Sequence, residues 1–383
     1  MANLVATLLS NPEIAATAVA AWDAGEAILP IDARAPHAEI EARLAQARPT
    51  HVVDGDGRRV RRDGIPVDAD TAAVLATSGT TGRPKLVELT RTGLDVMGRG
   101  YTAAVGAGAS DCWLACMPLH HVASLAIVAR AYTCGLPYLV HESFDLERVA
   151  RSHEAGVTMV SVVPTVLLRL LDARAPVHRF RSIIVGGAVL PPALRARAET
   201  AGAHLDDAYG LSETWGGAVT NGEPNAGMEL RLGRDDEILL RGAPVMRGYR
   251  FDPEQTAGVL DPDGWFHTGD VGRIVGGRLA VVDRLKDLVI TGGVNVSPTE
   301  VEDVLLTHPD VRDVCVVGRA DPEWGERVVA VVVAAEPSSP PSLEQLRDYV
   351  GEQLARAKLP RELVLVDAIP RSVSGKALRR LLR

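Results

Sequence analysis

Short apolar runs alternate with helical patterns between residues 70 and 210, and this alternation limits the possible fold more than any other feature. The apolar runs predict strands at 74–77, 113–117, 138–140, 158–162, 183–185 and 204–208. The helical patterns fall between and beside them, at 89–105, 123–131, 145–154, 164–172 and 191–201. Strands that alternate with helices of this length indicate parallel sheets covered by helices. The predicted fold class is therefore layered α/β.

The pattern changes after residue 229. Residues 229–280 combine short strands with Gly and Pro turns, which predicts a small β-rich subdomain. The last hundred residues return to mixed α+β, with a helix that opens at Ser297-Pro298-Thr299-Glu300 as a capping box. We expect a large domain over 1–283 and a smaller, mobile α+β domain over 284–383.

Length and composition restrict the class of protein. A chain of 383 residues is expected to form more than one domain. The net charge of −8 argues against a broad nucleic-acid surface. No apolar run approaches the roughly 20 residues of a membrane helix, and no secretory signal precedes the first pattern. Four cysteines do not make a disulfide framework, so the cytoplasm is the expected compartment.

Lysine is scarce in this chain. Among the 41 basic residues, lysine occurs only at Lys85, Lys286, Lys358 and Lys376. A chain with this bias uses arginine wherever any cation suffices, so lysine is expected where a compact ammonium group is needed. Chance placement is the alternative, and the motifs around each lysine decide between the two.

The strongest local motif directly follows the strand predicted at 74–77. Its glycines let the backbone aim N–H groups at an anion, and its hydroxyls and lysine add donors and positive charge. The predicted phosphate-binding residues are Thr77, Ser78, Gly79, Thr80, Thr81, Gly82 and Lys85. A Walker A loop does not fit, because Arg83-Pro84 separates Gly82 from Lys85. Taken alone, such a loop is also compatible with an ordinary surface turn.

The order of residues in this motif resembles the phosphate loop of the adenylate-forming superfamily, which includes acyl- and aryl-CoA ligases, peptide-synthetase adenylation domains and luciferases. In that family the loop wraps the β- and γ-phosphates of ATP. The family usually has glycine where this chain has Leu86. Further motifs match the family in order along the chain, up to about the last residue.

The resemblance assigns several residues of the large domain. His121, at the end of Pro118-Leu119-His120-His121, would line the carboxylate pocket. In 207–214, Asp207 and Tyr209, followed by Gly210, would bind adenine, and Thr214 would contact the α-phosphate. Glu213 would hold Mg²⁺ together with Thr80, in keeping with that ion's use of one or two carboxylates plus phosphate oxygens. A zinc site built on Cys112, Cys116 and the histidines fits no usual spacing.

Further assignments concern the C-terminal part. Asp270 would accept both ribose hydroxyls, and Arg284 would contact ribose or phosphate. Lys286 would be the hinge, and Gly292 and Gly293 would face the CoA tunnel. Lys376 would stabilise the negative charge that develops during attack on the α-phosphorus. Lys358 matches a lysine common in the family but receives no role.

The resemblance implies an ATP-dependent acid–thiol ligase. The acid would first become an acyl-AMP with release of pyrophosphate, and CoA would then take the acyl group. A stand-alone enzyme that loads a carrier protein and a catalytically silent nucleotide-binding homologue are the alternatives. Small or aromatic candidates for the acyl pocket favour a short or aryl acid, as in o-succinylbenzoate–CoA ligases: His121, Ser124, Gly186, Gly187, Trp215, Gly216 and Gly217. Relative to the family the N-terminal subdomain is expected to be truncated, and a homodimer is one way to cover the exposed core.

Overall fold

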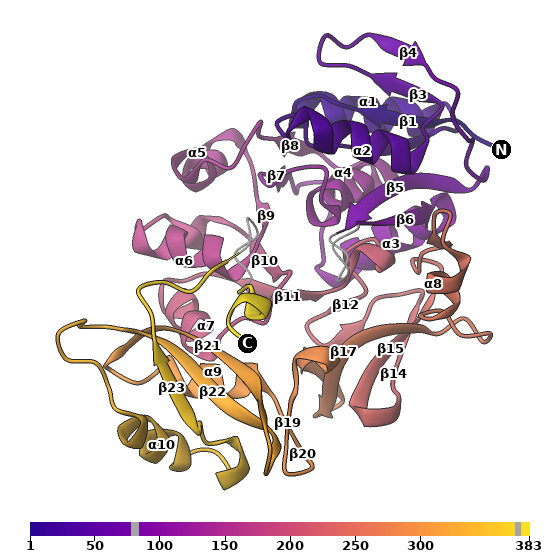
Figure 1. The fold of residues 1–383 in the computed structure, drawn as a ribbon. Helices are drawn as coiled ribbons and strands as arrows, with labels where there is room; N and C mark the ends of the chain where they lie inside the picture. The colour runs from indigo at the N-terminus through magenta and orange to yellow at the C-terminus, as the bar shows by residue number, and fades with distance from the viewer. Residues whose placement is uncertain (78–83, 372–376) are drawn as a thin grey trace. The chain divides into compact units, whose positions relative to one another are not determined.

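The computed structural model describes residues 1–77, 84–371 and 377–383 (Figure 1). These residues divide into two compact units. Unit 1 contains Met1–Leu190, Arg197–Arg231 and Leu239–Thr268. Unit 2 contains Pro191–Ala196, Leu232–Ile238 and Gly269–Arg383. The layered α/β fold class with a smaller α+β part is confirmed.

The first sheet of unit 1 has the strand order β16-β6-β5-β2-β1-β3-β4. Four neighbouring strands, β5, β2, β1 and β3, run parallel, and the outer strands are antiparallel. In β1 and β2 successive residues alternate between two hydrophobic clusters, so both faces are buried at the centre of the sheet, whereas the edge strand β4 is exposed. Helix α2 covers one face and α1 the other. The bounds are β1 Leu4–Thr7, α1 Asn11–Asp23, β2 Ala27–Pro30, α2 His37–Ala47, β3 His51–Val53, β4 Arg59–Arg61, β5 Thr71–Thr77, β6 Lys85–Thr90 and β16 Gly248–Tyr249.

The second sheet of unit 1 has the order β13-β12-β11-β10-β9-β7-β8, with five parallel strands from β11 to β8. One hydrophobic cluster draws residues from both sheets and from α1, α3 and α4, so the sheets share a core. The bounds are α3 Arg91–Ala104, β7 Trp113–Ala115, α4 Val122–Cys134, β8 Tyr138–Val140, α5 Leu146–Arg151, β9 Met159–Val162, α6 Pro164–Asp172, β10 Ser182–Gly186, α7 Pro192–Thr200, β11 Leu205–Tyr209, β12 Val219–Thr220 and β13 Glu223–Pro224.

The predicted elements of this region form with small shifts at their ends. Helix α3 begins at Arg91 because Leu89 still pairs with Ala73 in the sheet and the side chain of Thr90 caps the helix. Helix α5 ends at Arg151, where a short 3₁₀ turn takes over. The β-rich region then forms a four-stranded sheet in the order β14-β15-β17-β18. Its bounds are β14 Met228–Leu232, β15 Glu237–Gly242, α8 Pro253–Ala257, β17 Phe266–Val275 and β18 Arg278–Arg284.

The C-terminal part of unit 2 is a five-stranded sheet in the order β20-β19-β22-β21, with β23 paired to β22. Helix α9 begins at Pro298 with Ser297 as its cap, as predicted. The Glu300 carboxylate, expected to complete the capping box, pairs instead with Lys358 at 2.6 Å. Lys358, which received no role from the resemblance, therefore forms an ion pair with the first turn of α9. The bounds are β19 Val289–Thr291, β20 Val294–Val296, α9 Pro298–Leu305, β21 Val311–Asp321, β22 Gly325–Ala334, α10 Leu343–Gly351 and β23 Glu362–Leu365.

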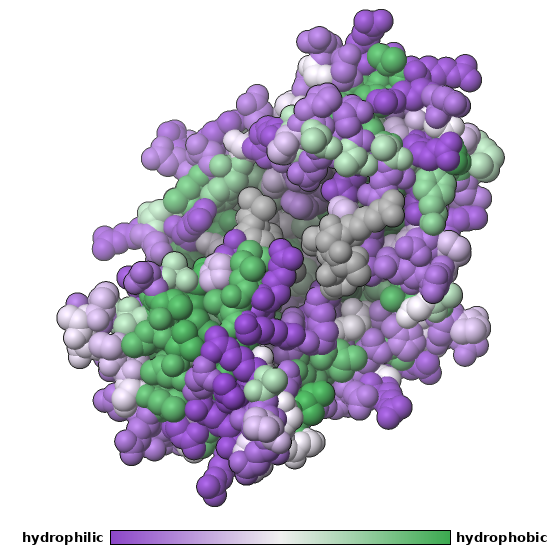
Figure 2. Space-filling model, in the orientation of Figure 1, coloured by the Kyte–Doolittle hydropathy of each residue, from purple (hydrophilic) through white to green (hydrophobic). Residues whose placement is uncertain are grey.

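Hydrophilic residues cover much of the face drawn in Figure 2. No helix within 1–77, 84–371 and 377–383 is both long and apolar enough to cross a bilayer.

Candidate active site

The phosphate-loop motif is anchored by the hairpin of β5 and β6. Thr77 ends β5, Lys85 begins β6, and the antiparallel register sets these two residues opposite each other. The hairpin therefore returns the lysine to the point where the loop begins. The remaining predicted loop residues lie outside the described part of the chain: Ser78, Gly79, Thr80, Thr81 and Gly82.

Lys85 and Glu213 both contact Tyr249, a residue that the motifs did not select. The Tyr249 hydroxyl donates a hydrogen bond of 2.9 Å to Oε1 of Glu213. Nζ of Lys85 lies 3.4 Å from the same hydroxyl and 4.6 Å from the centre of the tyrosine ring. Burial, followed by the negative charge of Glu213, raises the pKa of Tyr249, so the hydroxyl keeps its proton at neutral pH. Lys85, predicted to bind phosphate, and Glu213, predicted to bind Mg²⁺, thus both contact the hydroxyl of Tyr249.

Glu213 and Thr214 lie on the short 3₁₀ turn Ser212–Thr214 after β11. Thr214 is fully buried, and its hydroxyl accepts a hydrogen bond from the Leu211 N–H at 3.0 Å. The carbonyl of Glu213 accepts a hydrogen bond from the N–H of Met246 at 2.7 Å. Backbone contacts on both sides therefore hold Glu213 in place. One oriented carboxylate that shares a contact with Lys85 fits Mg²⁺, which takes its other oxygens from phosphates and water.

The predicted adenine residues lie at the carboxyl end of β11. Asp207 and Tyr209 belong to this strand and are half-buried, and Gly210 follows it directly. A Cβ atom on Gly210 would come within 2.7 Å of the backbone of Gly216 and Gly217. Only glycine allows this close approach of two backbone segments.

Asn11, at the start of α1, holds the backbone before the two histidines. Its Nδ2 donates to the carbonyls of Met117 at 3.3 Å and His141 at 3.1 Å, and its Oδ1 accepts from the N–H of Leu119 at 3.0 Å. These bonds explain why β7 stops at Ala115 and not at the predicted 117. The motifs gave no signal for Asn11, because its partners lie more than a hundred residues away.

His121 is the N-cap residue of α4, and its ring centre lies 4.3 Å from that of His120. His121 is exposed at the surface, whereas His120 is half-buried. Burial lowers the pKa of His121 and, with the charge of its neighbour, lowers the pKa of His120 to about 4. Both rings are therefore neutral at physiological pH and can donate one hydrogen bond each.

The predicted acyl-pocket residues occupy two kinds of environment. Gly186 ends β10 and Gly187 follows it, while Gly216 lies against Val122, the residue after His121. Ser124 and Trp215 instead lie in the core, with 1% and 0% of their surface exposed. The Trp215 indole N–H donates to the carbonyl of Thr90 at 3.1 Å. A pocket role for these two side chains stays a prediction.

In unit 2, Asp270 on β17 and Arg284 on β18 are register partners. Nε of Arg284 lies 2.6 Å from Oδ1 of Asp270, whose surface is 5% exposed. A positive charge thus already faces the carboxylate predicted to accept the ribose hydroxyls. The pairing orients the carboxylate, whose oxygens are hydrogen-bond acceptors.

Lys286 lies on the 3₁₀ turn Leu285–Asp287. Gly292 and Gly293 form the two-residue turn between β19 and β20, with φ of 57° and 77°. Two positive φ values in succession favour glycine, and a Cβ on Gly292 would also meet the ring of Trp324 at 2.8 Å. Lys376 lies outside the described residues.

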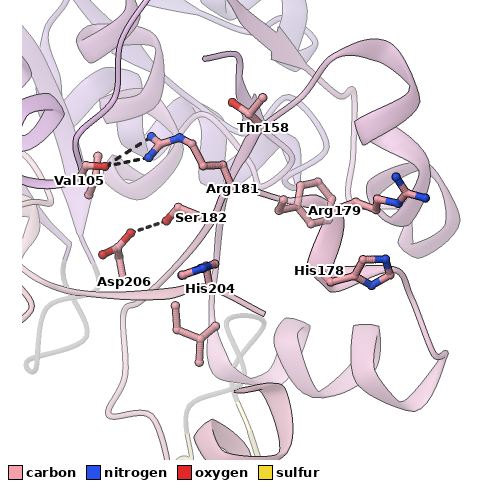
Figure 3. A pocket seen from close by; sticks show the side chains of 10 residues that line it. Val105, Thr158, His178, Arg179, Arg181, Ser182, His204 and Asp206 are labelled. Atoms are coloured by element: carbon pink, nitrogen blue, oxygen red, sulfur yellow. Dashed lines mark hydrogen bonds between the residues drawn. The ribbon is translucent and has the colours of Figure 1, made fainter. Parts of the chain in front are cut away.

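A surface hollow of 520 Å³ lies elsewhere in unit 1, at the amino ends of β9, β10 and β11 (Figure 3). The Arg181 guanidinium lies there, with Nε 2.7 Å from Oδ1 of Asp111. The hydroxyl of Ser182 donates to Asp206 at 2.5 Å. Among the residues that the structure describes, no predicted site residue lines this hollow. Ligands of open α/β sheets bind at the carboxyl ends of the strands, where Gly186 and Tyr209 lie.

Comparisons with known proteins agree with the predicted family. Residues 54–282 match the family described as AMP-binding enzyme, and residues 300–376 match the AMP-binding enzyme C-terminal domain. The probable 2-succinylbenzoate–CoA ligase of Mycobacterium tuberculosis is 36% identical over 330 residues, which are 83% of this chain and 85% of the relative. The 2-succinylbenzoate–CoA ligase of Bacillus subtilis is 35% identical over 346 residues, 82% of this chain and 68% of the relative.

Solved structures lead to the same family. The o-succinylbenzoate CoA synthetase of Bacillus subtilis in complex with the acyl-adenylate OSB-AMP matches with a TM-score of 0.87 and 29% identity, covering 100% of this chain and 88% of that one. The ATP-bound MatB of Rhodopseudomonas palustris matches with a TM-score of 0.88 and 26% identity, with the same coverage. The chain therefore belongs to the AMP-binding enzyme family, and it is an AMP-forming acid–CoA ligase.

Proposed function

We propose that the acid activated by this ligase is 2-succinylbenzoate. The observation that carries the proposal is the similarity to ligases of that name in Mycobacterium tuberculosis and Bacillus subtilis, 36% and 35% identical over more than four fifths of this chain. Gly186 and Gly187 at the carboxyl end of β10 support it, because ligands of open α/β sheets bind at that edge.

The reaction has two steps, and the described residues suit the first. The acid carboxylate attacks the α-phosphorus of ATP, which gives acyl-AMP and pyrophosphate. Lys85 is set to bind the pyrophosphate, and the neutral ring of His121 to contact the acid carboxylate. Glu213, with Thr80, would hold Mg²⁺, which neutralises phosphate charge when bound. Asp270 would accept the ribose hydroxyls, and the ring of Tyr209 would stack on adenine.

In the second step the CoA sulfur attacks the acyl carbon, and AMP leaves. We infer that residues 284–383 rotate at Lys286 between the steps, which removes Lys376 and brings the Gly292-Gly293 turn to the thiol. Such a movement keeps the acyl-AMP away from water. Comparing pyrophosphate exchange with thiolysis of preformed acyl-AMP separates the two steps.

The test of the acid is an ATP–pyrophosphate exchange screen with 2-succinylbenzoate, benzoate, an aliphatic dicarboxylate and a fatty acid. We expect 2-succinylbenzoate to exceed the others by about 10²-fold, because it alone among the four carries both an aromatic ring and a second carboxylate. Equal exchange with benzoate or the dicarboxylate overturns the assignment.

Two further proposals concern partners. Loading of a carrier protein is the alternative to CoA as acceptor, and it predicts acyl transfer to a phosphopantetheinyl protein without CoA consumption.

A homodimer is also proposed, because unit 1 exposes apolar side chains such as Tyr132 and Leu139. Light scattering that gives a monomer mass across micromolar concentrations contradicts it.

A further inference from the structure

Tyr249 is a residue of the candidate site that none of the motifs named above includes. Its side chain is 6% exposed, and its hydroxyl lies within hydrogen-bond reach of both Glu213 and Lys85. Those two groups come from a turn and a strand separated by more than a hundred residues of sequence. One phenol thus joins the carboxylate predicted to hold Mg²⁺ and the ammonium group predicted to bind phosphate.

The backbone fixes all three side chains in this arrangement. Tyr249 lies on β16, which pairs with β6 so that Tyr249 stands opposite Val87, close to Lys85. The N–H of Tyr249 donates to the hydroxyl of Thr256 at 2.9 Å. The N–H of Met246, three residues earlier, binds the carbonyl of Glu213 at 2.7 Å. The segment 246–249 therefore contacts both the strand of the lysine and the turn of the glutamate.

The phenol of Tyr249 can bridge two groups of opposite charge, the Glu213 carboxylate and the Lys85 ammonium group. Its single proton goes to Glu213, and its lone pairs accept from Lys85, while the ring face attracts the ammonium group. A free Lys and Glu each sample many rotamers, and ordering them on substrate binding costs free energy. Mg²⁺ also demands near-ideal octahedral geometry, so a carboxylate that samples many orientations binds it poorly.

We propose that Tyr249 is a positioning residue of the adenylation step, which holds the Glu213 carboxylate and the Lys85 ammonium ready for the magnesium-bound phosphates of ATP. This inference rests on the roles proposed above for Glu213 and Lys85. It concerns MgATP alone, so the thiolysis step does not depend on it.

The test compares Tyr249→Phe with Tyr132→Phe in the full chain. Tyr132 is a matched control, because its hydroxyl also donates to a carboxylate, Oδ1 of Asp23, at 2.9 Å. We expect Tyr249→Phe to raise the Mg²⁺ concentration for half-maximal pyrophosphate exchange by about tenfold, the scale of one hydrogen bond to a charged group. Calorimetry with α,β-methylene-ATP should show the same weakening with Mg²⁺ present. Thiolysis of preformed acyl-AMP and the thermal midpoint should match those of Tyr132→Phe.

The Glu213→Gln background separates the two ways in which the idea can fail. If Glu213→Gln raises the Mg²⁺ requirement and Tyr249→Phe adds nothing further, the phenol acts through Glu213. If Glu213→Gln leaves the requirement unchanged, the magnesium role of Glu213 is wrong. If Glu213→Gln raises it and Tyr249→Phe alone changes neither the Mg²⁺ requirement nor analogue binding, the positioning role of Tyr249 is wrong.

Discussion

Replacement of Asn11 by Ala tests whether one side chain holds the histidine segment in place. Asn11 is 7% exposed and makes three bonds to backbone groups, at 3.0, 3.1 and 3.3 Å. A buried backbone group that loses its partner costs about 1–3 kcal/mol. Because the bond to Met117 is long and water can enter the space left by the side chain, we expect a total loss of about 3 kcal/mol.

The assay is urea unfolding followed by tryptophan fluorescence, together with the KM for the acid in pyrophosphate exchange. Asn11→Ala should lower the unfolding midpoint and raise this KM, because the backbone that presents His121 loses its support. Asn11→Asp keeps the acceptor for Leu119 but sets a carboxylate against two carbonyl oxygens, so it should be at least as destabilising. Asn3→Ala is the control, because it removes one bond to Glu26 at 2.7 Å and one long bond from the Thr50 hydroxyl at 3.4 Å. A loss below about 0.5 kcal/mol with an unchanged KM refutes the reasoning.

The other predictions concern separate parts of the chain. Lys376→Ala should lower adenylation by about 10²–10³-fold, the scale of a lost oxyanion donor, and spare thiolysis of preformed acyl-AMP; near-normal pyrophosphate exchange contradicts it. Gly210→Ala should raise the KM for ATP and lower the thermal midpoint, because its Cβ would meet backbone at 2.7 Å; an unchanged KM shows that the turn can move. Burial, followed by the negative charges of Asp283 and Glu300, raises the pKa of Asp303 from 3.8 to about 6. The neutral form is thus favoured in the folded state, so stability is lost as pH rises from about 4 to 6, by about 1–2 kcal/mol after allowance for partial exposure. Asp303→Asn should remove this slope in urea unfolding at pH 4.5 and 7.5, and an identical slope in both proteins counts against the prediction.

The periodicity of the sequence predicted much of the fold. The run at 138–140 and the pattern at 164–172 coincide with β8 and α6, because a strand between turns and a helix with proline at its first position carry their own end signals. Where an end depended on a distant side chain, the prediction was wrong. The strand predicted at 113–117 is shorter because Asn11 binds the backbone at Met117 and Leu119.

In the candidate site, too, residues with a local sequence signal could be predicted, and residues placed by distant contacts could not. Thr77, Lys85 and Glu213 could be named because each belongs to a continuous motif whose order carries the signal. Tyr249 could not, because a tyrosine in a short strand is ordinary until the sheet register places it beside Lys85. Trp215 was chosen for its aromatic ring, yet it lies fully buried with φ of 54°. The roles assigned to Lys286 and to Lys376 stay predictions.

The Asp283 carboxylate has a consequence for the proposed rotation at Lys286. Its Oδ2 accepts hydrogen bonds from the hydroxyl of Ser297 at 2.8 Å and from the N–H of Thr299 at 2.9 Å. Asp283 precedes Lys286 in the chain, whereas both partners follow it. A rotation that carries Ser297 away from Asp283 would break one buried and one partly buried bond to this carboxylate, each worth about 1.5–3 kcal/mol. We therefore expect these two bonds to add to the free energy that the proposed rotation requires.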